Sequence, residues 1–133
     1  MTDDPVGSGF RNVLLCDDVR KEIGNKRTIV GVFSGDIIVS SVPAVVPLAA
    51  YIEFMPTSLD DNEIEFRFLV GNKPIATLKA TLNDLQMGVV AVLELPKIVI
   101  HATQPTEVSI DAQIKNRPVQ RLMTKKILVG PIS

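Results

Sequence analysis

Two consecutive runs of the chain, Glu63–Val70 and Pro74–Leu82, constrain its fold most strongly. In both runs apolar residues alternate with polar ones, the two-residue period of strands that bury a single face. Directly opposed residues of an antiparallel pair point to the same side, so matching the two apolar faces places Phe68 opposite Ala76. The pattern therefore predicts a β-hairpin closed by the three-residue loop Gly71-Asn72-Lys73.

The rest of the chain consists of further strand-length runs rich in branched aliphatic residues, which pack well on a pleated sheet. Turns containing Gly, Pro or Asn separate them, and no helix of more than two turns can be placed. We therefore expect an all-β fold, an antiparallel two-sheet β-sandwich of the immunoglobulin-like or C2-like kind with little or no helix. The runs are 12–20, 27–33, 36–39, 48–54, 89–95, 98–101, 107–114, 119–122 and 126–129.

Two features predict how the early strands connect. The pair Gly24-Asn25 suits a reversing turn, so 12–20 and 27–33 are expected to form a hairpin. Pro43 and Pro47 cannot donate to a sheet, and we expect the chain to cross between sheets or run along an edge there.

The length of 133 residues suits one domain with a single core. Residues 1–10 are polar, contain Pro5, Gly7 and Gly9 and lack periodicity, which predicts a mobile leader unless they dock as an edge strand. Residues 11–133 are then the single β-sandwich domain.

Charge and composition exclude several classes of function. Fourteen basic and fifteen acidic residues are spread along the chain and give a net charge of −1, so a nucleic-acid partner is not expected. The longest uncharged stretch, 37–52, contains two prolines and is shorter than a membrane span of roughly 20 residues. The start does not resemble a signal peptide, and a single Cys offers no disulfide framework, so a cytoplasmic location is expected.

The N-terminal part, about residues 11–55, resembles a family of short bacterial proteins of unknown function. The resemblance implies a bacterial, cytoplasmic β domain and transfers no catalytic residue. It is carried by Leu14-Leu15-Cys16-Asp17-Asp18-Val19-Arg20, by Glu22, Gly24 and Lys26, and by the stretch Ile29-Val30-Gly31-Val32-Phe33-Ser34-Gly35-Asp36-Ile37, which is followed by Pro43 and Pro47.

Cys16 and His101 are the residues from which a nucleophile and its base could be built. Such a pair must lie within hydrogen-bond reach, yet the two are far apart in sequence and Cys16 sits among apolar residues. A buried, inert Cys and a structural His are the commoner situations. With no second His and no other Cys, a transition-metal site would have to rely on carboxylates.

Aspartates supply the candidate metal ligands, because calcium prefers oxygen donors. Their spacing does not match an EF-hand, but sandwich loops can gather aspartates at one end, and a solvated or turn-forming role is the alternative. The candidates are Asp17, Asp18, Asp36, Asp60 and Asp61.

The mean hydropathy of +0.26 is high for a small domain, and the stretches 37–50 and 89–95 are apolar on both faces. Strands of this kind are central in a core or buried against another chain. We therefore expect a non-enzymatic binding module that needs no cofactor and pairs with a protein partner or with itself. The alternative is a domain that binds calcium or a small ligand through the loop aspartates, and an enzyme is the least favoured interpretation.

Overall fold

The computed structural model describes residues 9–24 and 26–131, and within them every regular element is a β-strand. The central strands are long, while β4 has only three residues. The strands are β1 (Phe10–Cys16), β2 (Asp18–Glu22), β3 (Lys26–Val30), β4 (Ile37–Val39), β5 (Ala44–Phe54), β6 (Glu63–Val70), β7 (Lys73–Thr81), β8 (Ala91–Ala102), β9 (Thr106–Ile114) and β10 (Gln120–Val129).

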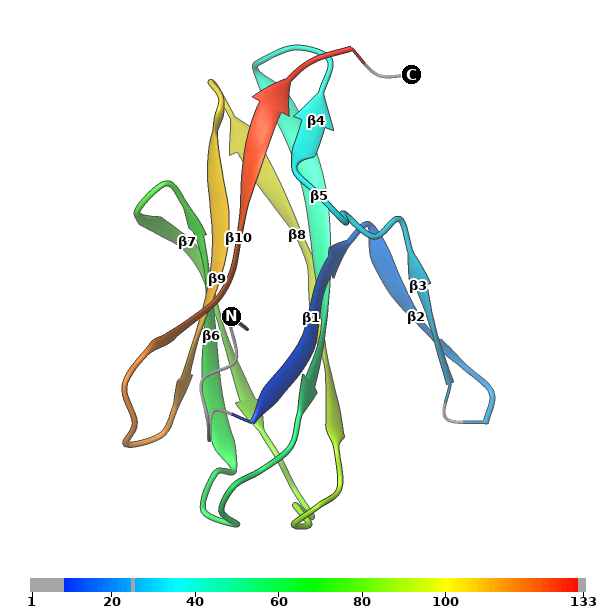
Figure 1. Ribbon diagram of the computed structural model, residues 1–133, viewed down its shortest axis with the longest axis vertical. Coiled ribbons are helices and arrows are strands. Elements are labelled where there is room, and N and C mark those ends of the chain that lie inside the picture. Colours follow the sequence, from blue (N-terminus) through cyan, green and yellow to red (C-terminus); the bar gives the residue numbers. More distant parts are fainter. Residues whose placement is uncertain (1–8, 25, 132–133) are drawn as a thin grey trace.

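Two sheets face each other and form a sandwich (Figure 1), which confirms the all-β expectation. The three-stranded sheet has the order β1-β5-β8, and the five-stranded sheet the order β4-β10-β9-β6-β7. Two details differ from an all-antiparallel two-sheet fold: β4 pairs with β10 in parallel, and β2 and β3 form a separate two-stranded ribbon. β4 follows the ribbon in the chain and pairs with the last strand of the sandwich, so the two paired strands come from distant parts of the sequence.

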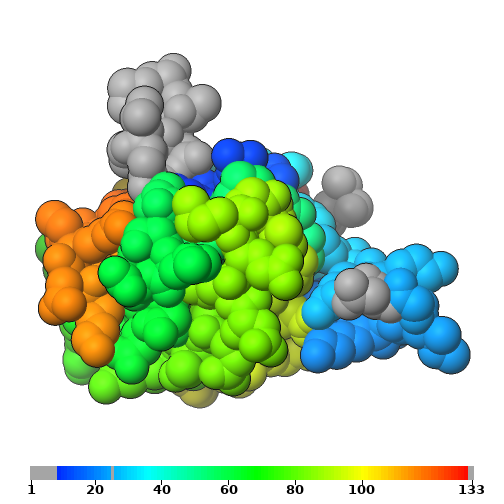
Figure 2. Space-filling model, turned by 90° about the horizontal axis from the view of Figure 1, so that it is seen from below, coloured from blue at the N-terminus to red at the C-terminus, as the bar shows by residue number. Residues whose placement is uncertain are grey.

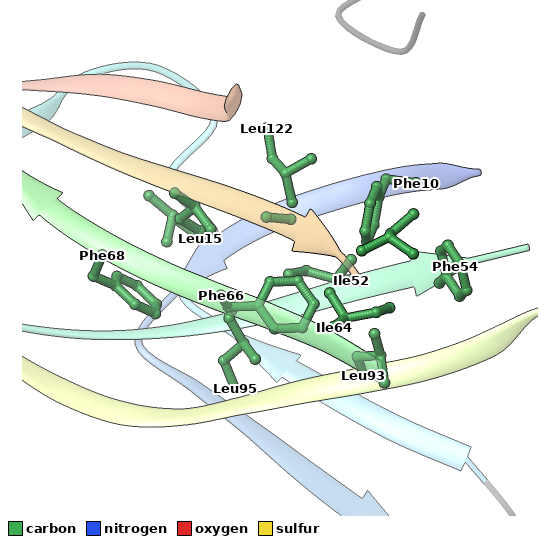
Figure 3. Close-up of a cluster of buried hydrophobic side chains, with 14 residues drawn as sticks. Phe10, Leu15, Ile52, Phe54, Ile64, Phe66, Phe68, Leu93, Leu95 and Leu122 are labelled. Carbon is green, nitrogen blue, oxygen red and sulfur yellow. The ribbon is translucent and has the colours of Figure 1, made fainter. Parts of the chain in front are cut away.

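The core fills the space between the two sheets (Figure 3). The Phe10 ring lies 4.9 Å from that of Phe54, and it meets the Phe66 ring edge-on at 6.1 Å. Phe10, which the sequence assigned to the leader, is thus the first residue of β1 and is buried, because its ring fills this aromatic contact. Residues 1–8 of the expected leader lie outside the described residues.

The β6–β7 hairpin has the predicted pairing, with Phe68 opposite Ala76. Its loop, however, is the two-residue turn Gly71-Asn72 rather than the three-residue loop expected. A bulge reconciles the two observations: Leu69 pairs with Pro74, so Ile75 is an extra residue that restores the register of the apolar faces.

A second bulge lies in β8, at Pro96 and Lys97. Leu95 pairs with Ala50 and Ile98 with Leu48, so the single residue Ala49 lies opposite both Pro96 and Lys97. The extra residue changes which alternate positions of β8 point into the core. Leu95 before the bulge and Ile98 after it, three positions apart, therefore both pack in the core. Pro96 therefore interrupts the pairing without ending the strand, and the two expected runs merge into one. The runs 119–122 and 126–129 likewise merge into β10.

The chain changes sheets between β4 and β5, as the prolines predicted. The Val42–Pro43 peptide bond in this connection is cis. Pro47 lies within β5 and not before it, so β5 starts earlier than expected. β1 pairs with β5 only from Ala49 onward, so Pro47 has a ladder partner on the β8 side alone, a position that tolerates a missing donor.

Candidate functional site

The β2–β3 ribbon is the feature that sets this chain apart from a plain sandwich. It stands out from the body in both views (Figures 1 and 2). The predicted run 12–20 is divided at Asp17, with β1 on one side in the three-stranded sheet and β2 on the other in the ribbon. The backbone N–H of Asp17 lies 2.9 Å from the carbonyl of Val30 and 3.1 Å from that of Gly31, which closes the ribbon where it leaves the sheet.

Gly31 is required at this closure. Its φ of +67° is in the left-handed region that favours glycine, and a Cβ at this position would lie 2.1 Å from Asp17 Oδ2. The next contact is the N–H of Phe33, which donates to the carbonyl of Leu15 at 2.9 Å. These bonds fix where the ribbon starts.

An ion pair joins the ribbon to the three-stranded sheet. Arg27 Nε on β3 lies 2.5 Å from Glu94 Oε1 on β8, with 18% and 22% of the two side chains exposed. Val19 of the ribbon lines a pocket of about 250 Å³ against Ala49 and the Pro96 bulge. The ribbon therefore covers part of the outer face of the three-stranded sheet and leaves a small recess beneath it.

A hydrogen-bonded cluster lies on the same outer face. The Tyr51 hydroxyl donates to Glu53 Oε2 at 2.7 Å, and the Asn12 amide donates to Glu53 Oε1 at 2.6 Å. The Tyr51 bond, followed by the Asn12 bond, lowers the pKa of Glu53, whereas the bond to Glu53 is the main cause that raises the pKa of Tyr51.

A bulge in β1 brings Asn12 to this cluster. Arg11 pairs with Glu53 and Leu14 with Tyr51, so Asn12 and Val13 together lie opposite a single residue of β5. Asn12 has a φ of 48°, a left-handed conformation that asparagine tolerates better than most residues. Donors therefore satisfy both oxygens of Glu53, and the cluster is better suited to holding the sheet surface in shape than to proton transfer.

The tip of the ribbon is apolar and basic. The Ile23 side chain is 95% exposed, the largest exposure among the exposed large hydrophobic residues of the described chain. Lys21 and Lys26 flank it, are exposed, and form no ion pair with another described residue. Ile23 therefore contributes no core packing to the ribbon, and a two-stranded ribbon on its own is only marginally stable in water.

The structure does not bring Cys16 and His101 together. Cys16 is fully buried at the end of β1 opposite Ala49, and its thiol lies 3.6 Å from the Ala49 carbonyl. His101 is exposed on β8, on the other side of β5, and lies opposite Val45, four positions before Ala49, so the two residues are separated by roughly 13 Å along β5 and by two strand spacings across the sheet. Burial raises the pKa of the Cys16 thiol, and the charges of the neighbouring Asp17 and Asp18 raise it further.

The candidate aspartates do not form one cluster. Asp18 binds its neighbours, accepting from the Val19 N–H and from Arg20 Nε, and Asp36 accepts from the backbone N–H of Lys126. Asp60 and Asp61 follow β5 at its far end from Asp17. Within 9–24 and 26–131, no three His, Cys, Asp or Glu side chains are grouped closely enough to hold a metal ion.

Asp61 is a buried carboxylate that binds two neighbouring side chains. It is buried, lies 2.8 Å from Arg117 Nη2, and accepts a 3.0 Å bond from the Thr57 hydroxyl. Arg117 Nη1 also donates to that hydroxyl at 3.1 Å. The three side chains join the β5–β6 loop to the β9–β10 turn at one end of the sandwich.

Sequence reasoning missed the ribbon as a separate element and the Tyr51–Glu53–Asn12 cluster. The only signal for the ribbon was the polar pair Asp17-Asp18 within an otherwise strand-like run, combined with Gly31. The cluster has no signal in the sequence, because it depends on a bulge and on strand order.

Comparisons with known proteins give no name to this site. No protein-family model matches the chain, and no curated protein matches it either. In the part of the chain that the structure describes, no helix has the length and apolar character needed to cross a membrane.

Proposed function

We propose that this domain is a non-enzymatic protein-binding module whose binding element is the β2–β3 ribbon. The observation that carries the proposal is the nearly complete exposure of Ile23 at the tip of an arm held away from the core. Interface energy concentrates in a few side chains that fill a pocket on the partner, and an apolar side chain on a projecting arm can reach such a pocket. The proposal assigns no catalytic residue and no cofactor.

The way the ribbon is anchored supports the proposal. Hydrogen bonds at Asp17 fix the root of the arm, and the Arg27–Glu94 ion pair holds its tip-side half against the three-stranded sheet, while the Ile23 side chain stays exposed. Pre-orientation lowers the entropy cost of binding, because the partner does not have to order the whole arm. The single Cys, which has no disulfide partner in the chain, supports action in a reducing compartment such as a bacterial cytoplasm.

Affinity capture with three tagged forms tests the proposal: the wild type, Ile23→Asp, and Val129→Asp as a control at another exposed apolar position. We expect the wild type and the control to recover a common protein that Ile23→Asp loses. Recovery of the same proteins by all three forms would refute a binding role for the ribbon. Parallel captures with calcium and with a chelator address the aspartate alternative, because a partner that depends on calcium but not on Ile23 would favour it.

A further inference from the structure

A second apolar surface lies at the end of the sandwich where β5 leads into β6 and β7 into β8. The loops 55–62 and 82–90 form it and lie side by side (Figures 1 and 2), joined by a 2.8 Å bond from the Leu82 N–H to the Asn62 carbonyl. We call this surface the acidic end. Its exposed apolar side chains are Leu59, Met87, Val89 and Val90.

The acidic end has negative charge that the described chain does not neutralise. The two loops contain Asp60, Asp61 and Asp84 but no Lys or Arg. Asp61 is neutralised by Arg117, whereas Asp60 and Asp84 are exposed and form no ion pair with a described residue. The surface therefore combines apolar side chains with two free carboxylates.

The ribbon tip has the opposite charge on a similar apolar centre. Lys21 and Lys26 lie on opposite faces of the ribbon beside Ile23, and they outnumber the one acid of the tip, Glu22, which pairs with Lys26 and accepts a 2.9 Å hydrogen bond from the Thr28 hydroxyl. In Figure 2 the ribbon stands clear of the two loops of its own molecule. The tip and the acidic end are thus complementary surfaces at different places on one chain.

We infer that the ribbon tip of one copy docks on the acidic end of a second copy of this chain. Ile23 then packs among the exposed apolar side chains of the two loops, and Lys21 and Lys26 face Asp60 and Asp84. This inference rests on the proposed role of the ribbon as the binding element and adds the identity of the partner. Because the two surfaces differ, a docked pair still has one free ribbon tip and one free acidic end, and the contact propagates into rings or open chains.

Sedimentation velocity of the purified chain over a concentration series tests the inference. Docking predicts assemblies that grow with concentration and dissociate in high salt, because the screening length falls from about 8 Å at physiological ionic strength to about 3 Å at 1 M. Two charge-reversed variants, Lys21→Glu/Lys26→Glu and Asp60→Lys/Asp84→Lys, are each expected to be monomeric. Their equimolar mixture should assemble again, since every ribbon then finds an end of opposite charge. Lys73→Glu/Lys126→Glu, which reverses two exposed lysines elsewhere, is the matched control and should assemble like the wild type.

Three outcomes would overturn the inference: a wild type that is monomeric throughout, reversed variants that assemble as the wild type does, or a mixture that stays monomeric while thermal unfolding shows both variants folded. A monomeric wild type together with an Ile23-dependent partner in the capture experiment would reject self-docking and leave the binding role of the ribbon intact. A monomeric wild type with no Ile23-dependent partner in the capture experiment would reject both self-docking and the binding role of the ribbon.

Discussion

Arg27 of the ribbon forms an ion pair with Glu94 on the edge strand β8, 67 positions later in the chain. Both side chains are mostly buried, so solvent screens this pair less than it screens pairs at the open surface. The pair links an element with little core of its own to the three-stranded sheet. Its removal should therefore affect the ribbon before it affects the sandwich.

We predict that Glu94→Gln speeds amide hydrogen exchange in β2 and β3 and leaves exchange in β5 unchanged, because only the local opening of the ribbon becomes easier. A double-mutant cycle with Arg27→Gln should give a coupling energy of about 1 kcal/mol in the free energy of opening the ribbon, measured from the same amide exchange. Equal acceleration in the ribbon and in β5 would show instead that the pair stabilises the whole domain.

Gly31→Ala is predicted to destabilise the domain by about 1–2 kcal/mol, the cost of a left-handed conformation for an L-residue. The new Cβ would also displace the Asp17 carboxylate. Gly35→Ala is the matched control, because no atom lies within 4 Å of a Cβ built there. Denaturant unfolding of both variants checks the prediction, and equal midpoints would contradict the strain assigned to Gly31.

Asp61→Ala is predicted to lower the free energy of unfolding by about 1–3 kcal/mol, because it leaves Arg117 and Thr57 without their buried acceptor. The neighbouring Asp60→Ala changes an exposed carboxylate and should stay within about 0.5 kcal/mol of the wild type. Chemical denaturation measures the free energy of unfolding of both variants. Similar losses from the two variants would mean that loop conformation, and not the buried ion pair, stabilises this end.

The Cys16 thiol is predicted to react slowly with thiol reagents in the native state, since it is buried and its pKa is raised. In denaturant the reaction should become fast. Thr28→Cys, at an exposed ribbon position, provides a reactive control thiol in a Cys16→Ala background. The raised pKa also means that the stability contributed by the neutral thiol is present below the ordinary pKa and is lost as the pH rises through the folded value. Rapid native labelling at Cys16 would contradict its burial.

Tyr51→Phe is predicted to raise the pKa of Glu53 back toward its ordinary value, because it removes the largest cause of the lowering. In the wild type the lowered pKa of Glu53 contributes stability that is present above its ordinary pKa and is lost as the pH falls through the folded value. An NMR titration of the Glu53 carboxyl carbon tests the shift, with Thr77→Val on the other sheet as the control. An unchanged titration midpoint in Tyr51→Phe would exclude the hydrogen bond as the cause.

The sequence was most informative where one face of a strand meets the core. Alternation around Phe66 and Phe68 predicted the strand pairing, because a slip of one residue would expose the whole apolar set. It could not predict the bulge at Ile75, since a shorter loop with a bulge and a longer loop without one place Phe68 opposite Ala76 equally well.

The candidate site was much less predictable. Asp17 divides a run that reads as one strand, and only tertiary hydrogen bonds to Val30 and Gly31 show where the chain leaves the sheet. The bonds of Glu53 to Tyr51 and Asn12 combine two strands and a bulge, so no local pattern encodes them. The exposure of Ile23 was also hidden, because an apolar residue beside a turn suits a buried strand end as well as a free tip.

The parallel pairing of β4 with β10 bears on how the sandwich is completed during synthesis. Asp36, just before β4, accepts a bond from the backbone of Lys126, ninety residues later, and Ile37 pairs with Ile127. β4 therefore has no ladder partner until translation has passed β10, and the buried cluster of Ile37 stays incomplete until Ile127 has been synthesised. Contacts between such distant segments slow folding. A nascent chain stalled before β10 should be a substrate for chaperones that bind exposed apolar strands, and one stalled well beyond it should not.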